Sequence, residues 1–289
     1  MFCAEVGSVQ NRRRLDEIFR EHRPQAVYHA AAYKHVPLME AHLFEAVENN
    51  IFGTHEVARA ARAAGVKTVV LVSSDKAVRP VSVMGATKRM AELVCLAANE
   101  EDARTRFLAV RFGNVLGSNG SVIPRFRRQI AAGGPVTVTH PEMRRYFMTI
   151  AEAAQLVLQA AALGTGGEVF VLDMGEPVRI LDLARKMILL SGLKPDADIR
   201  IEFSGIRPGE KLCEELSAYE EDTLPTRHSQ IRVFSGSGVA RAALSRCLED
   251  LREAVAARDR EGAVYCMRDL IPEYDPSTFV IGRAVARAG

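Results

Sequence analysis

The sequence predicts an α/β protein with a doubly wound parallel sheet and a smaller lobe in its carboxyl-terminal part. Strand and helix patterns alternate through the first two-thirds of the 289 residues, as a parallel sheet with helical crossovers requires. The apolar run 68–72 ends in adjacent hydroxyl, acid and base side chains, which is how a parallel strand delivers polar groups at its carboxyl end. After Gly113 glycine and proline interrupt shorter elements, which indicates ligand-binding loops above the sheet.

The periodicity of apolar residues places each element in turn. We expect a helix over 11–21, a strand over 26–29, a helix over 43–64, a strand over 67–72, a helix over 84–99, strands over 107–112 and 167–174, and a helix over 180–191. Gly65 ends the long helix, and Pro80 keeps the following loop extended.

Two structural units are expected. The first covers residues 1–178, with insertions from the smaller lobe after 113, and the second covers 179–289 and holds the C-terminal helices. Residues 198–236 are expected to lie in the smaller lobe. From Val239 onward the charged helical pattern indicates no role.

Composition limits the class of protein. The chain has 48% apolar and 26% charged residues and a net charge of +2, which gives no reason to expect nucleic acid or an acidic membrane as a partner. Its five cysteines form no Cys-x-x-Cys pair, which favours a reducing compartment. No apolar run reaches the roughly 18 residues of a membrane span, and no signal-peptide or metal-ligand pattern occurs. We therefore expect a cytoplasmic protein with no metal.

The residues after the run 68–72 form the candidate site. Ser74, Asp75 and Lys76 supply a hydroxyl, an acid and a base, and Met84 and Lys88 lie one turn apart on the next helix, so that both face the strand end. Ser and Asp are also ordinary turn formers, and a helical Lys is most often on the surface. The two groups together favour an active site.

These residues resemble those of the short-chain dehydrogenase/reductases, which place Ser or Thr at this strand end and Tyr-x-x-x-Lys on the next helix. Here Met84 stands at the Tyr position. The pattern is similar to the Met-containing branch of the nucleotide-sugar 4,6-dehydratases in the capsule and polysaccharide biosynthesis family. The resemblance runs from about Gly7 to Gly236. It includes the motifs HAAAYKHVP (29–37), NIFGT (50–54), RFGNVLG (111–117), GSVIP (120–124) and RPGEK (207–211).

The resemblance implies a Rossmann-like fold and a role for each catalytic residue. Ser74 would hold the sugar's 4-oxygen, Asp75 would protonate the departing 6-hydroxyl, and Lys76 would remove the proton from carbon 5. Met84 cannot transfer a proton, so either Asp75 takes the proton of the 4-hydroxyl or the site is degenerate. A lysine is a base near neutral pH only if its pKa falls well below about 10.4, and we expect Lys88 to lower the pKa of Lys76.

The resemblance also implies binding residues on two sides of the site. On the cofactor side they are Ala30, Ala31, Ala32, Asn50 and Lys88, with Lys88 on the nicotinamide ribose. On the substrate side they are Lys34, His35, Asn114, Arg145, Arg207 and Glu210, with the two arginines on the diphosphate and Glu210 on a ribose hydroxyl.

The implied activity is NAD-dependent 4,6-dehydration of a UDP-N-acetylhexosamine, with UDP-N-acetylglucosamine favoured, in the synthesis of surface polysaccharide or glycan. Two alternatives stay open: a 4-epimerase, which needs no Asp-Lys pair and normally retains the Tyr, and a non-catalytic fragment that binds nucleotide sugars. Members of the superfamily commonly dimerise through the helices that correspond to 43–64 and 84–99, so we expect a homodimer.

NAD binding depends on a turn that this sequence does not contain. A dinucleotide-binding fold normally opens with a Gly-x-x-Gly-x-x-Gly turn, and Ser8 stands where the family has an Asp that contacts adenine. We expect the first βαβα unit to be missing from this chain, and the 289-residue chain alone to bind NAD weakly or not at all. Calorimetric titration checks this, and a sub-micromolar dissociation constant would refute it.

Overall fold

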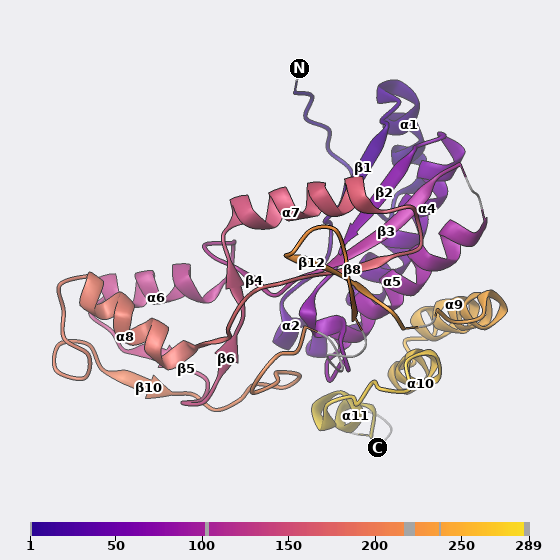
Figure 1. The fold of residues 1–289 in the computed structure, drawn as a ribbon. Helices are drawn as coiled ribbons and strands as arrows, with labels where there is room; N and C mark the ends of the chain where they lie inside the picture. Colours follow the sequence, from indigo (N-terminus) through magenta and orange to yellow (C-terminus); the bar gives the residue numbers. More distant parts are fainter. Residues whose placement is uncertain (1, 102–103, 217–222, 237, 286–289) are drawn as a thin grey trace.

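The computed structural model describes residues 2–101, 104–216, 223–236 and 238–285. The strands of its main sheet are β1 (Ala26–His29), β2 (Thr68–Val72), β3 (Arg106–Arg111), β8 (Val169–Leu172), β11 (Thr223–Pro225) and β12 (Ile231–Phe234). They lie in the order β1-β2-β3-β8-β12-β11. The first four are parallel (Figure 1). β12 and β11 join them antiparallel. The predicted α/β fold is confirmed.

Alternate side chains of the central strands face two apolar cores. Val69 and Leu71 of β2 pack toward α1 (Arg12–His22), α4 (Gly53–Ala63) and α5 (Val83–Glu101). Val70 lies in the other core, with α7 (Ile150–Leu163), which crosses the opposite face of the sheet (Figure 1). Because both faces of these strands are covered, they form continuous apolar runs in the sequence, and this is why the runs could be located. The predicted strands and helices form, the last of them as α8 (Ile180–Leu190).

The helix predicted over 43–64 forms, but not as one α-helix. α3 (Leu43–Ala46) passes into a π-helical turn, η1 (Val47–Phe52), before α4 begins. Thr54 donates a hydrogen bond from Oγ1 to the Asn50 carbonyl oxygen (2.6 Å). π-Helical turns occur often at functional sites. Here the turn carries Asn50, whose side chain contacts both the loop after β1 and α5.

The smaller lobe lies to one side of the main sheet (Figure 1). It consists of α6 (Val122–Ala131), β5 (Val136–Val138), α8 and β10 (Ile201–Phe203), with β5 and β10 paired in parallel. Two short strand pairs accompany these elements: β4 (Asn114–Val115) with β7 (Phe147–Met148), and β6 (Arg144–Arg145) with β9 (Val178–Arg179). An apolar core that includes Phe126, Val136 and Ile188 holds the lobe together.

Residues 198–236 do not lie wholly in this lobe as expected. β10 belongs to it, but β12 pairs with β8 in the main sheet because Ile231 and Val233 supply apolar side chains to the cores there. The division of the chain at 178/179 stays a prediction.

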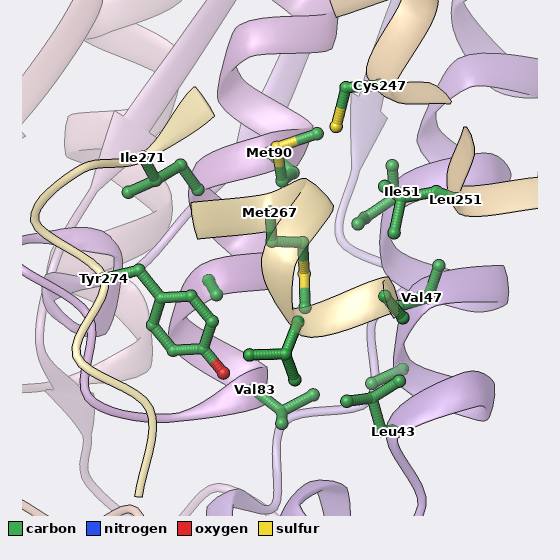
Figure 2. Packing of buried hydrophobic residues seen from close by; sticks show 14 of the residues in the cluster. Leu43, Val47, Ile51, Val83, Met90, Cys247, Leu251, Met267, Ile271 and Tyr274 are labelled. Atoms are coloured by element: carbon green, nitrogen blue, oxygen red, sulfur yellow. The ribbon is translucent and has the colours of Figure 1, made fainter. Parts of the chain in front are cut away.

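The C-terminal helices cover the start of α5. α9 (Arg241–Ala256), α10 (Arg260–Leu270) and α11 (Thr278–Val285) share one apolar core with α5, η1 and α2 (Val36–Ala41). Figure 2 shows Met267 and Tyr274 of this segment near Val83 of α5 and Leu43 of α3. Within the described ranges no helix is both long and apolar enough to cross a bilayer.

A buried carboxylate connects this segment to the amino end of α5. Glu40 in α2 accepts a hydrogen bond from the backbone N–H of Val83 (2.7 Å) and another from the hydroxyl of Ser277. The backbone N–H of Asp275 donates to the carbonyl of Pro80 (3.0 Å). The segment for which the sequence indicated no role therefore fixes the first turn of α5.

A second buried carboxylate joins α5 to two strand ends. Glu92 accepts two hydrogen bonds from Arg111 (2.8 and 2.7 Å), one from the Ser73 hydroxyl (2.6 Å) and one from Arg89 (3.0 Å). The Arg111 guanidinium lies 4.7 Å from the centre of the Phe234 ring. Burial alone would raise the pKa of Glu92, but the two arginines and the hydrogen bonds lower it to about 2.

Glu92→Gln should destabilise the protein, because it leaves the buried guanidinium of Arg111 and the half-buried one of Arg89 without their counter-charge. We expect a loss of about 3–5 kcal/mol in the free energy of unfolding at neutral pH. The folded pKa lies below the ordinary value of 4.5, so this stability is present above pH 4.5 and is lost as the pH falls toward about 2. Urea unfolding at several pH values measures both effects. Glu100→Gln, on the exposed side of α5, is the control, and equal stability of the two variants would contradict the prediction.

Candidate active site

The carboxyl ends of β2 and β3 lie side by side at a cavity of about 500 Å³. The backbone N–H of Ser73 donates to the Val110 carbonyl (2.8 Å) and that of Asp75 to the Phe112 carbonyl (3.0 Å), which extends the pairing past the strand ends. Residues from these ends line one wall, and α6, β5 and the loop around Arg207 line the other. The cavity therefore occupies the edge where parallel sheets bind ligands.

A single turn brings the three predicted catalytic groups together. η2 (Asp75–Ala77), a 3-10 turn, follows Ser74. The Ser74 hydroxyl donates to Asp75 Oδ1 (2.9 Å), and Lys76 Nζ donates to the same oxygen (2.9 Å). Lys76 Nζ also donates to Asn114 Oδ1 (3.3 Å). Ser74, Lys76 and Asn114 line the cavity, and Asp75 lies behind them.

Asp75 is fully buried, and one of its oxygens has no partner. Oδ2 makes no hydrogen bond to any described residue. A Cβ added to Gly113 would lie 3.1 Å from this oxygen, so glycine leaves the space beside it open. An unpartnered buried carboxylate oxygen costs stability, and such atoms often mark a functional role.

The charge of Lys76 is set by two carboxylates. Burial lowers the pKa of Lys76, but attraction by Asp75 and by Glu214, whose Oε1 is 3.6 Å from Nζ, outweighs burial and raises the pKa above its ordinary value. The expectation that Lys88 lowers the pKa of Lys76 is therefore wrong. The sequence could not reveal that the fold brings Glu214 close to Lys76.

Met84 and Lys88 extend from α5 to the same cavity, as predicted. Met84 is buried and lines the cavity, at the sequence position where the resemblance led us to expect a Tyr base. Lys88 Nζ donates to the carbonyl of Val72 at the end of β2 (2.6 Å). Burial lowers the pKa of Lys88 to about 8, although Glu92 opposes the shift.

The predicted cofactor residues divide into lining and supporting groups. Ala30 and Ala32 line the cavity, whereas Ala31 and Asn50 do not. The Asn50 side chain accepts from the backbone N–H of Tyr33 (2.8 Å) and donates to the Tyr33 carbonyl (3.1 Å) and the Thr87 hydroxyl (3.0 Å). It therefore holds the loop after β1 against α5.

At the other end of the cavity, Lys34 and His35 both line the wall. Lys34 Nζ donates to the Ser118 hydroxyl (3.3 Å). His35 packs under Gly120, where φ is +70° and an added Cβ would lie 2.4 Å from the imidazole, so that only glycine fits.

The predicted phosphate and ribose contacts also line the cavity. Arg207 pairs with Glu210 through two contacts (2.6 and 3.1 Å). Arg145 is buried, and its guanidinium donates to the carbonyls of Arg144, Lys211 and Leu212 (2.6, 2.9 and 3.2 Å).

Comparison with known proteins identifies the family. The profile of the polysaccharide biosynthesis protein family matches residues 1–235. The chain belongs to this family. It is 63% identical over 215 residues to the capsular polysaccharide biosynthesis protein CapD of Staphylococcus aureus, covering 74% of this chain and 36% of CapD. It is 53% identical over 257 residues to the probable polysaccharide biosynthesis protein EpsC of Bacillus subtilis (strain 168), covering 88% of this chain and 42% of EpsC. The chain thus spans less than half the length of either relative.

Other similar proteins include enzymes named for sugar chemistry. The UDP-glucose 4-epimerase of Rickettsia bellii (strain OSU 85-389) is 37% identical over 218 residues, covering 75% of this chain and 62% of the epimerase. The solved structure of Pen from Bacillus thuringiensis matches with a TM-score of 0.73 and 34% identity, over 86% of this chain and 81% of Pen. DesIV of Streptomyces venezuelae, a dTDP-glucose 4,6-dehydratase solved with NAD, matches with a TM-score of 0.65 and 21% identity over 73% and 69% of the chains, and shares the fold.

In this member of the polysaccharide biosynthesis protein family, sequence reasoning missed two charged residues that line the cavity. Glu214 is buried beside Lys76 and lines the cavity. The sequence feature that could have identified it is the pair of acidic residues that follows shortly after the RPGEK motif. Arg125 directly follows the GSVIP motif, but a single helical Arg is usually solvated. Among the described residues, the one group with metal-ligand geometry is Glu5, Glu21 and His22, which is exposed and lines no part of this cavity.

The buried ammonium of Lys88 should give the protein a distinctive pH dependence. In the folded protein the pKa of Lys88 is about 8, against an ordinary value of 10.5. Below pH 8 Lys88 is protonated in both the folded and the unfolded protein, so the full free-energy cost of burying its charge applies. Between pH 8 and 10.5 the unfolded chain binds more protons, and stability rises. We expect the wild type to gain about 3 kcal/mol relative to Lys88→Met across this range.

Chemical denaturation of both proteins from pH 7 to 10.5 measures the gain. Lys67→Met, at an exposed position just before β2, is the control and should show no such change. A constant difference between the wild type and Lys88→Met would contradict the prediction.

Proposed function

We propose that this chain carries the catalytic centre of an NAD-dependent nucleotide-sugar 4,6-dehydratase that acts on a UDP-N-acetylhexosamine, with UDP-N-acetylglucosamine as the first substrate to test. The proposal rests on the cluster of Ser74, Asp75 and Lys76, in which a buried carboxylate and an ammonium share a hydrogen bond at the cavity wall. Loss of water needs one group to remove a proton from carbon and another to protonate the departing hydroxyl. A carboxylate–ammonium pair can do both.

The pair can reach the required protonation states by an internal transfer. Moving one proton from Lys76 Nζ to Asp75 Oδ1, across 2.9 Å, gives a neutral amine and a carboxylic acid. The amine faces the cavity and can take the proton from carbon 5. The acid lies behind Ser74, so its proton reaches the 6-hydroxyl through the Ser74 hydroxyl, with which it already shares a hydrogen bond. The departing hydroxyl leaves as water, and Lys76 can return its proton to carbon 5 when hydride is added at carbon 6. The proton released from the 4-hydroxyl then restores the ion pair.

Because Met84 stands at the Tyr position, the proton of the 4-hydroxyl needs a route different from that in Tyr-containing relatives. Since a thioether cannot carry a proton, the proton of the 4-hydroxyl has to pass to another group. After the internal transfer Asp75 already holds a proton, so the proton of the 4-hydroxyl would pass through the Ser74 hydroxyl to water in the cavity.

The residues present fit the nicotinamide end of NAD. Ala30 and Ala32 give a wall of small side chains, and Lys88 holds a buried ammonium beside them. Lys88 would bind the nicotinamide ribose, and Asn50 would keep the loop that follows β1 in place. When bound, NAD would accept hydride from carbon 4 and return it at carbon 6. The cytoplasmic location and the homodimer stay predictions.

A 4-epimerase is the second candidate, because one relative that is 37% identical is named UDP-glucose 4-epimerase. The Asp75–Lys76 pair and Met84 favour the dehydratase, since epimerisation at carbon 4 requires no loss of water. The products separate the two: a dehydratase releases a sugar nucleotide lighter by one water, and an epimerase an isomer of unchanged mass.

Asp75→Asn and Lys76→Ala should each abolish formation of the 4-keto-6-deoxy product. The assay uses a longer polypeptide or a partner that supplies the glycine-rich turn, with UDP-N-acetylglucosamine and mass-spectrometric detection. Because each variant removes one member of the proton-transfer pair, we expect losses of at least about 100-fold in turnover.

Lys186→Ala, at an exposed position of α8, is the matched control and should retain full turnover. Near-normal turnover in either site variant would remove that residue from the mechanism. An isomer as the wild-type product would replace the dehydratase with the epimerase.

A further inference from the structure

The end of the cavity in the smaller lobe contains three arginines, and they differ in what their guanidinium groups contact. Arg145, Arg125 and Arg207 all line the cavity. A sugar nucleotide bound by its diphosphate needs cations whose N–H groups face the ligand. The contacts of each arginine therefore decide which of them can serve.

Arg145 is committed to the protein backbone. Its guanidinium donates to the carbonyls of Arg144, Lys211 and Leu212, and it lies 3.7 Å from Glu214. Only 7% of the residue is exposed. The contacts with Lys211 and Leu212 fix the end of the RPGEK motif and the residue after it to β6, which makes Arg145 a positioning residue.

Arg125 is anchored differently. It extends from the first turn of α6 and donates to the Thr137 hydroxyl on β5. Gln129, one turn further along α6, holds the same threonine through two hydrogen bonds (2.8 and 3.2 Å). Thr137 also lines the cavity, so this anchor holds the Arg125 guanidinium against the cavity wall.

Arg125 and Arg207 act on one another electrostatically. Burial lowers the pKa of Arg125, the charge of Arg207 lowers it further, and Glu210 opposes both. Glu210 pairs directly with Arg207 (2.6 Å) and is the carboxylate that partly offsets the two cations. Two cations that share one carboxylate at a cavity wall leave a net positive charge, which an anionic ligand can neutralise.

We propose that Arg125 and Arg207 together hold the diphosphate of the nucleotide sugar, and that Arg145 only positions the loop. This inference rests on the proposed function and deepens it, because it names a further residue that binds the substrate. Arg125 reaches the diphosphate from α6 and Arg207 from the loop after β10, so the ligand would connect the two sides of the smaller lobe.

Calorimetric titration of the 289-residue protein with UDP and with uridine tests the assignment. Arg125→Ala should weaken UDP binding about 10- to 100-fold, as the loss of a charge-assisted contact does, and Arg207→Ala should have a similar effect. Uridine carries no phosphate, so its affinity should change less than about threefold in either variant. Arg125→Lys keeps the charge without the planar fork and should recover part of the lost affinity.

Arg128→Ala, at an exposed position of the same helix outside the cavity, is the matched control and should bind UDP like the wild type. Unchanged UDP affinity in Arg125→Ala, with weakened binding in Arg207→Ala, would overturn the inference and leave the proposed function standing. Equal loss of uridine and UDP affinity in Arg125→Ala would also overturn it, since the residue would then shape the pocket. A wild-type protein that binds neither UDP nor UDP-N-acetylglucosamine would overturn the proposed function as well.

Discussion

The carboxylate of Glu92 sets the distance between the helix and the strands that form the site. It lies in the interior, where an ionised group is stable only with a full set of donors, and those donors come from three places: Ser73 after β2, Arg111 at the end of β3, and Arg89 on α5 itself. The carboxylate cannot keep these bonds if α5 slides or rotates. Because Lys88 lies one turn before Glu92, its place against the end of β2 follows from the same contacts.

Charged groups in the cavity wall set the pKa values of their neighbours. The carboxylates of Asp75 and Glu214 raise the pKa of Lys76, whereas Lys88 has fewer opposing charges nearby and burial lowers its pKa. Both lysines follow Ser74 in the sequence, yet their pKa values shift in opposite directions. Burial acts on both in the same direction, so neighbouring carboxylates decide the difference.

The sequence was informative where local pattern determines structure. The apolar runs located the central strands, and the spacing of Met84 and Lys88 placed both on one face of α5. Contacts between distant segments could not be read in the same way. Arg145 resembles a phosphate ligand in the sequence, but its hydrogen bonds go to carbonyls near residue 211, and only the fold brings those segments together. The sequence did not predict the π-helical turn for a related reason. The side chain of Asn50, which this turn carries, contacts residues in other elements of the fold.

The contact between Glu40 and Ser277 joins residues that are 237 positions apart. A ribosome releases α2 and α5 long before it releases α9, α10 and α11. During that interval the apolar faces of α2 and α5 that these helices cover have no partner from the same chain. The first turn of α5, which carries Met84, therefore acquires its final support only after α9, α10 and α11 have been synthesised. Nascent chains that end before about residue 240 should expose this apolar surface to chaperones, so the emergence of α9, α10 and α11 determines when the first turn of α5 is fully supported.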